Sequence, residues 1–261
     1  MFGVGVGVRV GGFTASSGGG FDPDAQAFFD RVTTAGGSLT TTEKNATNQL
    51  VLDMKSAGIW SSMKAIYPMV GASAAACAQN LKSSSFTGTF SSGWTFTSNG
   101  ATPNGLSAFM DTNFNPSVQL SGTSAHASLY PRTSLIGGYG IQGDFSSRMD
   151  IINFSGTLYS AMGTTGQTSY TGTYAGLIVG SRTSSTSNKL YVGGTLRDTK
   201  TASSTANFQN LNYWLGACNL NTFYSSNQCA FASIGDGLTD TQASNFYTAV
   251  QAFQVSLSRS V

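Results

Sequence analysis

Short apolar or aromatic runs recur between residues 86 and 235, separated by stretches of Ser, Thr, Asn and Gly. The runs are FTGTF (86–90), WTFTS (94–98), ASLYPRT (127–133), RMDIINF (148–154), AGLIVGSRT (175–183), KLYVGGTL (189–196), LNYWLGA (211–217) and CAFASIG (229–235). Many short strands divided by turn-forming residues are typical of an antiparallel sandwich or barrel. The pattern therefore predicts a mainly β fold over this part of the chain.

The composition supports a packed core but leaves the sheet edges poorly protected. Of the 261 residues 40% are hydrophobic, and 17 Phe, 10 Tyr and 3 Trp are enough to fill a core. Only 9% are charged, whereas an ordinary soluble protein has about 25%. Strands that lack Lys and Glu lack the usual protection against edge-to-edge pairing. We therefore expect neighbouring subunits to cover those edges.

A helical segment is predicted ahead of the strands. Asp22 followed by Pro23 is a good N-terminal pair for a helix that stops at two glycines, residues 36–37. Thr40 with Glu43 matches a capping box for a second helix. An apolar patch then continues the pattern, so residues 22 to about 68 are interpreted as helical and packed against a sheet.

The chain is expected to end in a third long helix. Thr239 and Gln242 match another capping box, and Phe246, Val250 and Phe253 then recur on one helical face together with Leu257. We expect this apolar face to pack on another part of the protein or of its assembly. Two arrangements fit the sequence equally: packing on the back of the sandwich, and packing against a matching helix of a partner subunit.

The first twenty residues form a segment of their own. Every second residue is apolar, namely Val4, Val6, Val8 and Val10, and Gly or Arg9 lies between them. Period two places all four valines on one face of an extended strand. The arm could add a strand to a neighbouring chain's sheet, or it could be an intramolecular edge strand.

The residue inventory excludes several functional classes. A net charge of +2 without any cluster of Lys or Arg makes nucleic-acid binding a poor fit. His126 is the only histidine and Glu43 the only glutamate, which argues against a His-based zinc site, a Ser-His-Asp triad or a Glu pair. Cys77, Cys218 and Cys229 form no CxxC and are expected to be buried thiols, with a Cys218–Cys229 bridge left open.

Targeting signals are not evident in the sequence. The N-terminal MFGVGVGVRVGG lacks the basic region and continuous apolar stretch of a signal peptide. No segment approaches the length and hydropathy of a membrane span. We expect an intracellularly made, unprocessed chain.

Two groups of segments resemble known families. KLYVGGTLRDT (189–199), LNYWLGACN (211–219) and FASIGDGLTDTQASNFY (231–247) resemble the closing half of a laminin-G-like or concanavalin-A-like jelly roll. DAQAFFDRV (24–32), NQLVLDMKSAGIWSSMKAIYPMVG (48–71), NLK (80–82) and GWTFTSNGATPNG (93–105) are similar to virion proteins of tailed phages that place a helical hairpin before such a jelly roll. The likeness covers about residues 22 to 255.

The resemblance implies an antiparallel concanavalin-A-like jelly-roll β-sandwich with an N-terminal helical hairpin and a C-terminal helix. It also implies a virion location, as a tail, fibre, spike or capsid-surface component made in the host cytoplasm. The implied partners are other virion proteins and copies of the chain itself. Some proteins of this kind are thought to bind host or mucosal glycans, which gives a second interpretation.

Acidic residues give little support to catalysis or to a metal site. A sandwich glycosidase needs two carboxyl groups flanking the scissile bond, but the aspartates lie in the helical part or near turns. No catalytic residue and no cofactor is therefore expected. Calcium would need acidic residues from several loops, and the only close pair among the strands is Asp144 with Asp150. His126 is expected to be a partly buried strand residue bonded to backbone.

Metal-free sugar binding requires an aromatic platform beside amide or carboxylate partners. The candidates are Trp94 with Asn99 and Asn104, and Tyr130 or Tyr139 further along the chain. The simpler interpretation is a core Trp with two asparagines in turns, because Asn-Gly pairs are found mainly in tight turns.

The sequence thus predicts an arm (1–20), a helical hairpin segment (21–82) and a jelly-roll sandwich with a C-terminal helix (83–261). The main functional hypothesis is a non-enzymatic virion structural protein that assembles through the arm and the sandwich surfaces. A glycan-binding module is the alternative, and a carbohydrate-active enzyme is a distant third.

Overall fold

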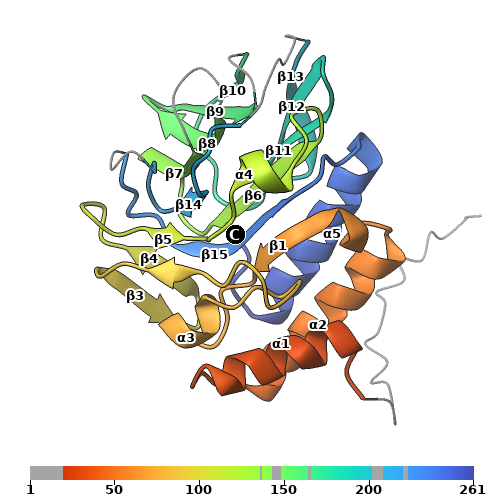
Figure 1. Cartoon of the computed structure of the whole chain (residues 1–261), viewed down its shortest axis with the longest axis vertical. Helices are drawn as coiled ribbons and strands as arrows, with labels where there is room; N and C mark the ends of the chain where they lie inside the picture. The colour runs from red at the N-terminus through yellow and green to blue at the C-terminus, as the bar shows by residue number, and fades with distance from the viewer. Residues whose placement is uncertain (1–19, 136, 143–147, 164–165, 202–207, 220–222) are drawn as a thin grey trace, which may run out of the picture.

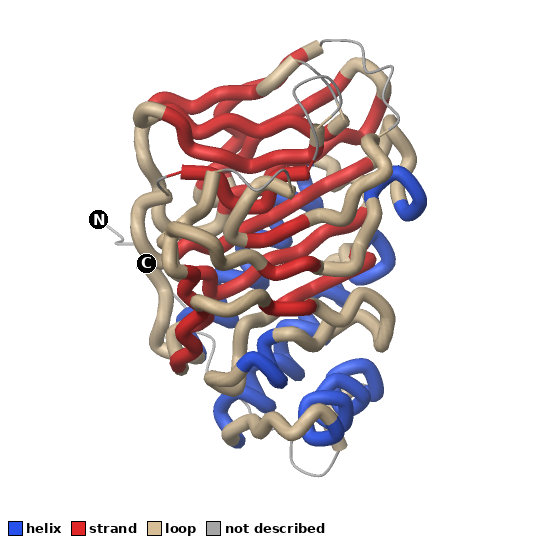
Figure 2. The backbone as a smooth tube through the Cα atoms, turned by 60° about the vertical axis from the view of Figure 1, so that its left-hand side comes forward, coloured by secondary structure: helices blue, strands red, loops and turns tan. Residues whose placement is uncertain are grey.

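The structure is a computed structural model that describes residues 20–135, 137–142, 148–163, 166–201, 208–219 and 223–261, with the backbone alone for 137–142. The four valines predicted to form an assembly arm lie outside these residues. Within them, the chain forms three layers, with helices on one side of a large antiparallel sheet and two smaller sheets on the other (Figures 1 and 2). The antiparallel β fold predicted from the sequence is confirmed.

The large sheet has eight strands in the order β13-β12-β11-β6-β15-β4-β3, and β1 also pairs with β15. Its strands are β1 (Met63–Tyr67), β3 (Trp94–Thr97), β4 (Gly100–Pro103), β6 (Ala125–Pro131), β11 (Ile178–Ser184), β12 (Ser187–Val192), β13 (Thr195–Lys200) and β15 (Cys229–Gly235). Every residue of β6 and β15 is buried, because both faces of these central strands are covered.

Two smaller sheets form the layer opposite. One has the order β10-β9-β8-β7, and the other has the order β14-β5-β2. The strands are β2 (Thr89–Phe90), β5 (Met110–Asp111), β7 (Gly137–Gln142), β8 (Met149–Phe154), β9 (Thr157–Met162), β10 (Thr168–Thr171) and β14 (Trp214–Leu215). β14 lies beside β7, so the two smaller sheets adjoin each other. β10 lies beside β13 of the large sheet, so the layers also meet along one edge.

Two cores hold the layers together. Leu129 and Ile178 of the large sheet face Met149 and Leu158 of the opposite layer in the sandwich core. Neighbouring strand residues point to opposite faces, so Tyr130, next to Leu129, belongs to the second core beneath the helices. The helices thus bury the back of the large sheet.

The helices begin where the capping residues predict. They are α1 (Pro23–Thr34), α2 (Thr41–Ser56), α3 (Ala74–Cys77), α4 (Pro116–Gln119) and α5 (Asp240–Ser256), with a 3-10 turn η1 (Trp60–Ser62). Asp22 caps α1, and Thr40 with Glu43 forms the capping box of α2. Thr239 and Gln242 form the matching box of α5. The predicted helix starts are confirmed.

The C-terminal helix packs on the back of the sandwich. Phe246 of α5 contacts Phe231 of β15 with ring centroids 5.9 Å apart, and Phe253 lies 6.3 Å from the same ring. α5 also packs beside α2, as Figure 1 shows. Of the two predicted arrangements, the structure supports packing on the sandwich.

One local interpretation was wrong. Residues 63–67 form strand β1 and not a helical extension, and Ile66 pairs with Ser233 of β15. The KLYVGGTL run contains most of β12, a tight turn and the start of β13, and Gly193 and Gly194 adopt positive φ angles of 60° and 73° in that turn. Two successive residues with positive φ are the requirement of a tight hairpin turn.

Among the residues that the structure describes, each helix is too short or too polar to reach across a bilayer.

Candidate functional site

Trp94, predicted as a sugar platform, is half-buried at the edge of the sandwich core. Its Nε1–H donates to the Phe109 carbonyl over 3.1 Å, and its ring packs edge-on against Phe90 with centroids 5.0 Å apart. It also lies parallel to Phe96, 6.4 Å away. The side chain is therefore used mainly for packing.

The two predicted asparagines lie in exposed turns on either side of β4. Asn99 lies in the β3–β4 turn. The Asn104 amide oxygen accepts backbone N–H groups of Leu106, Ser107 and Ala108 over 2.9–3.0 Å. Such a local network organises a loop. The simpler interpretation, a packed Trp with turn asparagines, fits this region better than a ready sugar site.

The prediction of Tyr130 as a surface platform for a sugar was wrong, because this side chain is fully buried. It points from β6 towards α5, where its hydroxyl donates to Gln251 Oε1 over 3.0 Å and accepts the Val261 N–H over 3.1 Å. Burial raises the pKa of this phenol. The other candidate, Tyr139, has its side chain outside the described part of the structure.

The structure describes one of the two aspartates considered for calcium binding. Asp144 lies outside the described residues, and Asp150 is fully buried in an ion pair with Arg148, with Nε and Oδ2 2.5 Å apart. Burial raises the pKa of Asp150 to about 6, against the opposing effect of Arg148. The described residues contain no group of three or more potential metal ligands.

His126 and the cysteines lie where the sequence predicted, as a buried strand residue bonded to backbone and as buried thiols. His126 lies fully buried on β6, with Nδ1 2.6 Å from the Asp236 carbonyl and Nε2 3.1 Å from Ser233 Oγ. Burial lowers its pKa to about 4. Cys77, Cys218 and Cys229 are buried free thiols, so the bridge that the sequence left open does not form.

A different set of residues meets the requirements for sugar binding, on the outward face of the β14-β5-β2 sheet. In register across these strands lie Trp214, Asp111 and Thr89. The neighbouring Leu215 and Met110 point into the sandwich core, so the first three must face outward. Thr89 is exposed, and Trp214 and Asp111 are half-buried.

Phe109 and Trp214 form the aromatic part of this surface. Their rings are parallel within 5°, and their centroids lie 3.7 Å apart. Phe109 lies two residues before Asp111, so it shares the outward face. Gly216 allows the close approach of Trp94 nearby, because a Cβ at Gly216 would lie 3.0 Å from the Trp94 ring.

Hydrogen bonds fix the polar part. Asn212 Nδ2 donates to Asp111 Oδ2 over 3.3 Å, and the Asn113 N–H donates to Asp111 Oδ1 over 2.8 Å. Asn113 Nδ2 donates to Thr89 Oγ1 over 3.2 Å. We call Thr89, Phe109, Asp111, Asn113, Asn212 and Trp214 the outer-sheet patch.

Sequence reasoning missed this patch because its two halves are 101 residues apart in the chain. The one local signal is the alternation in LNYWLG, where Asn212 and Trp214 are partly exposed and Tyr213 and Leu215 are buried. Period-two alternation of this kind marks one outward strand face. It would have indicated Trp214, but not its partner Asp111.

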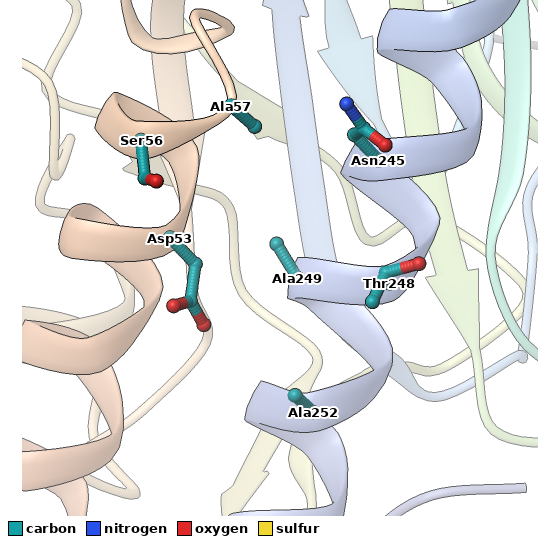
Figure 3. A pocket seen from close by; sticks show the side chains of 7 residues that line it. All are labelled: Asp53, Ser56, Ala57, Asn245, Thr248, Ala249 and Ala252. Carbon is teal, nitrogen blue, oxygen red and sulfur yellow. The ribbon is translucent and has the colours of Figure 1, made fainter.

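A shallow groove between α2 and α5 has a volume of about 390 Å³ (Figure 3). It is lined by Asp53, Ser56, Ala57, Asn245, Thr248, Ala249 and Ala252. No aromatic ring lines it, and its one charged group, Asp53, already accepts a hydrogen bond from Gln49 over 2.8 Å. The groove therefore offers no stacking surface for a sugar.

The described residues define an antiparallel β-sandwich covered by helices on one face, and solved structures share this architecture. Domain 4 of AbnA, an extracellular GH43 arabinanase from Geobacillus stearothermophilus solved with arabinotriose, has a TM-score of 0.53 at 15% identity, over 71% of this chain and 98% of that domain. A Trypanosoma rangeli sialidase mutant displaying trans-sialidase activity has a TM-score of 0.51 at 9% identity, over 79% of this chain and 39% of the sialidase.

No protein-family model and no curated protein sequence matches the chain. At these identities the structural matches establish the fold alone.

Proposed function

We propose that this chain is a glycan-binding module that binds sugars without cleaving them. The observation that carries the proposal is the outer-sheet patch, where the Trp214–Phe109 stack lies beside the hydrogen-bonded pair Asp111 and Asn212. This is the combination that metal-free sugar recognition requires. The proposal takes up the alternative prediction from the sequence, with a different set of residues.

The patch offers complementary surfaces to a sugar ring. A pyranose or furanose has an apolar C–H face that can pack on the Trp214 indole. Each Asp111 oxygen accepts one hydrogen bond in the described structure, and a carboxylate oxygen can accept more than one. Sugar hydroxyls are donors, so they can fill the remaining positions.

One further polar group is open to a ligand, and a second is unpaired but buried. Asn212 uses one amide N–H on Asp111, and its side-chain oxygen Oδ1 accepts no hydrogen bond from the described residues, whereas its backbone carbonyl accepts one from Asn219 Nδ2. The Trp214 Nε1–H has no acceptor among them either. A buried donor without a partner costs free energy, so a sugar or water oxygen that reaches it would stabilise the site.

The absence of cleavage is part of the proposal. Glycoside hydrolysis requires two carboxyl groups on either side of the scissile bond, and Asp111 is the only carboxylate in the outer-sheet patch. The arabinanase domain, which shares the sandwich fold and was solved with arabinotriose, makes that sugar a suitable first probe.

The finer fold assignment and the location stay predictions. We propose the concanavalin-like jelly roll as the class of this sandwich, since the layers and the antiparallel pairing are compatible with it. The virion role rests on the resemblance of residues 22–255 and on assembly through the sandwich surfaces and the arm at residues 1–20, nearly all of which lies outside the described structure. Neither the arabinanase domain nor the sialidase is a virion protein.

The test is binding of the full chain to arabinotriose by calorimetry and to a broad glycan array. Trp214→Ala and Asp111→Asn should each weaken binding of the recognised glycan by about tenfold or more, the loss expected for a stacked ring or a charged hydrogen bond. Phe154→Ala is the matched control, because Phe154 is a 58% exposed ring on β8 outside the patch.

Unfolding midpoints must accompany these measurements, since Trp214→Ala removes a half-buried ring. Asp111→Asn is nearly isosteric, so it separates lost recognition from lost folding. If the wild-type chain binds no glycan, or both patch variants bind as tightly as wild type, the proposal is wrong.

A further inference from the structure

Half-buried tyrosines gather around the turn between β12 and β13, far in sequence from the outer-sheet patch. Tyr170 is on β10, Tyr174 follows it in the loop before β11, and Tyr247 is on α5. β10 lies beside β13, where the Ser169 N–H donates to Asp198 Oδ2 over 2.8 Å. Figure 1 shows β10 next to the β12–β13 hairpin.

The turn glycines allow two of these rings to come close. A Cβ at Gly193 would lie 2.4 Å from the Tyr174 hydroxyl oxygen. A Cβ at Gly194 would lie 2.6 Å from Tyr247 Cδ1. Both distances are shorter than any real Cβ contact, and both glycines have positive φ. The hairpin turn therefore brings Tyr174 and Tyr247 to the same place.

A cation completes the cluster. The exposed Arg197 of β13 places its guanidinium carbon 5.2 Å from the centroid of the Tyr170 ring, within the range of a cation–π contact. Arg197 and Tyr247 both influence the pKa of Tyr174, which burial raises and Arg197 lowers. The four side chains thus lie near one another.

The polar groups of the cluster have free hydrogen-bonding capacity. Within the described part of the chain, no hydrogen bond uses the hydroxyl of Tyr170, Tyr174 or Tyr247, and Arg197 forms no salt bridge. The adjacent acid, Asp198, is already bound to Ser169 and to Lys200, with Nζ 3.2 Å away. Arg197 thus differs from Lys200 on the same strand, because Lys200 has a carboxylate partner and Arg197 has none among the described residues.

We propose that Tyr170, Tyr174, Tyr247 and Arg197 form a second sugar site, which binds glycans that carry a carboxylate. Arg197 pairs with the carboxylate, and its planar fork suits that group better than a single hydroxyl. The tyrosine rings supply the stacking surface, and their hydroxyls bind the sugar hydroxyls. The site goes beyond the outer-sheet patch, whose only charged group is the acid Asp111.

The test compares two probes that differ by one acidic sugar, sialyllactose and lactose, by calorimetry on the full chain. A disaccharide that contains glucuronic acid is the second acidic probe. We expect acidic glycans to bind about tenfold or more tightly than lactose. We also expect added salt to weaken their binding, because Arg197 is exposed.

Substitutions in the cluster test whether the acidic glycan binds there. Arg197→Gln should weaken sialyllactose binding by about tenfold, whereas Lys200→Gln, a cation on the same strand that is paired with Asp198, should leave it within about twofold. The triple change Tyr170→Phe, Tyr174→Phe and Tyr247→Phe keeps the rings and removes the hydroxyls, so it should weaken binding without unfolding the chain.

The outer-sheet patch serves as the control that separates the two sites. Trp214→Ala should leave sialyllactose binding intact, and Arg197→Gln should leave neutral glycan binding intact. The second site is refuted if neither acidic probe binds, if lactose binds equally well, if Arg197→Gln behaves as wild type, or if Trp214→Ala removes acidic-glycan binding. Neutral-glycan binding at the patch is tested separately, with arabinotriose and the variants Trp214→Ala and Asp111→Asn.

Discussion

Trp214 lies face to face with Phe109, with ring centroids 3.7 Å apart, and directly across the strand pair from Asp111. A stack of this kind presents a stiff aromatic surface, because each ring restrains the other. The strand pairing fixes the carboxylate beside that surface before any ligand arrives. Preorganisation of this kind reduces the entropy lost on binding, which is why a two-residue strand can still make a useful site.

Trp214 should therefore report binding through its fluorescence. The chain has three tryptophans, of which Trp60 lies under Lys82 with the ammonium 4.3 Å from its ring centroid. A glycan that covers the indole of Trp214 should shift its emission to shorter wavelength and protect it from iodide quenching. Both effects should disappear in Trp214→Phe and persist in Trp60→Phe. Persistence in Trp214→Phe would place the ligand elsewhere.

Two fully buried groups, His126 and Asp150, should give opposite contributions to the pH dependence of stability. The His126 pKa falls from 6.5 to about 4, so the unfolded chain takes up a proton first as the pH drops, and folding loses stability from about pH 6.5 down to about pH 4. The Asp150 pKa rises from 3.8 to about 6, so the unfolded chain loses its proton first, and stability falls as the pH rises from about 4 to about 6.

The two contributions oppose each other over most of this window and amount to about 3 kcal/mol each. We expect wild-type stability to change little between about pH 4 and about pH 6. His126→Gln should lose stability as the pH rises through that range, and Asp150→Asn should gain it. Urea unfolding across these pH values is the measurement, and parallel pH profiles for the two variants would contradict the assignment.

Local patterns predicted the helix starts, because a cap is a contact between residues three apart. Thr40 with Glu43 and Thr239 with Gln242 show both halves of their capping boxes in the structure. Strand β1 could not be predicted in the same way. A short apolar run does not distinguish a strand from a buried helix, and Ile66 becomes a strand residue by pairing with Ser233 of β15.

The candidate sites depend even more on distant contacts. Asp111 and Trp214 meet only because β5 and β14 pair, and Arg197 meets Tyr170 only because β10 lies beside β13. Tyr130 shows the converse problem. The sequence alone does not show on which face of the sheet a strand tyrosine lies. For Tyr130 the face is set by α5, which packs over the ring and accepts the hydroxyl hydrogen bond through Gln251.

The three cysteines should be inert in the folded protein. All are buried free thiols, and burial raises the pKa of Cys77 to about 12. The reactive species is the thiolate, so a thiol reagent at neutral pH should modify none of them in the native state and all three after denaturation. Rapid native modification of any one would indicate that its surroundings open readily.

Glu43 should matter more than an ordinary capping residue, because it binds two parts of the chain. Its Oε2 accepts the Thr40 N–H over 2.8 Å within the capping box, and its Oε1 accepts the Gly71 N–H over 2.7 Å. Gln242 occupies the same position in the capping box of α5 and provides a control, because its own distant contact is only a long bond of 3.5 Å from Nε2 to the Gly58 carbonyl. Removing a box costs about 1 kcal/mol, so we expect that loss for Gln242→Ala.

Glu43→Ala should cost about 2 kcal/mol, since it also leaves the Gly71 N–H without its charged acceptor. Thr40→Ala should resemble Gln242→Ala, because it keeps the bond to Gly71. The free energy of unfolding in urea gives all three values. Equal losses for Glu43→Ala and Gln242→Ala would mean that the bond to Gly71 adds nothing and that the first helices are held to the loop after β1 by apolar packing alone.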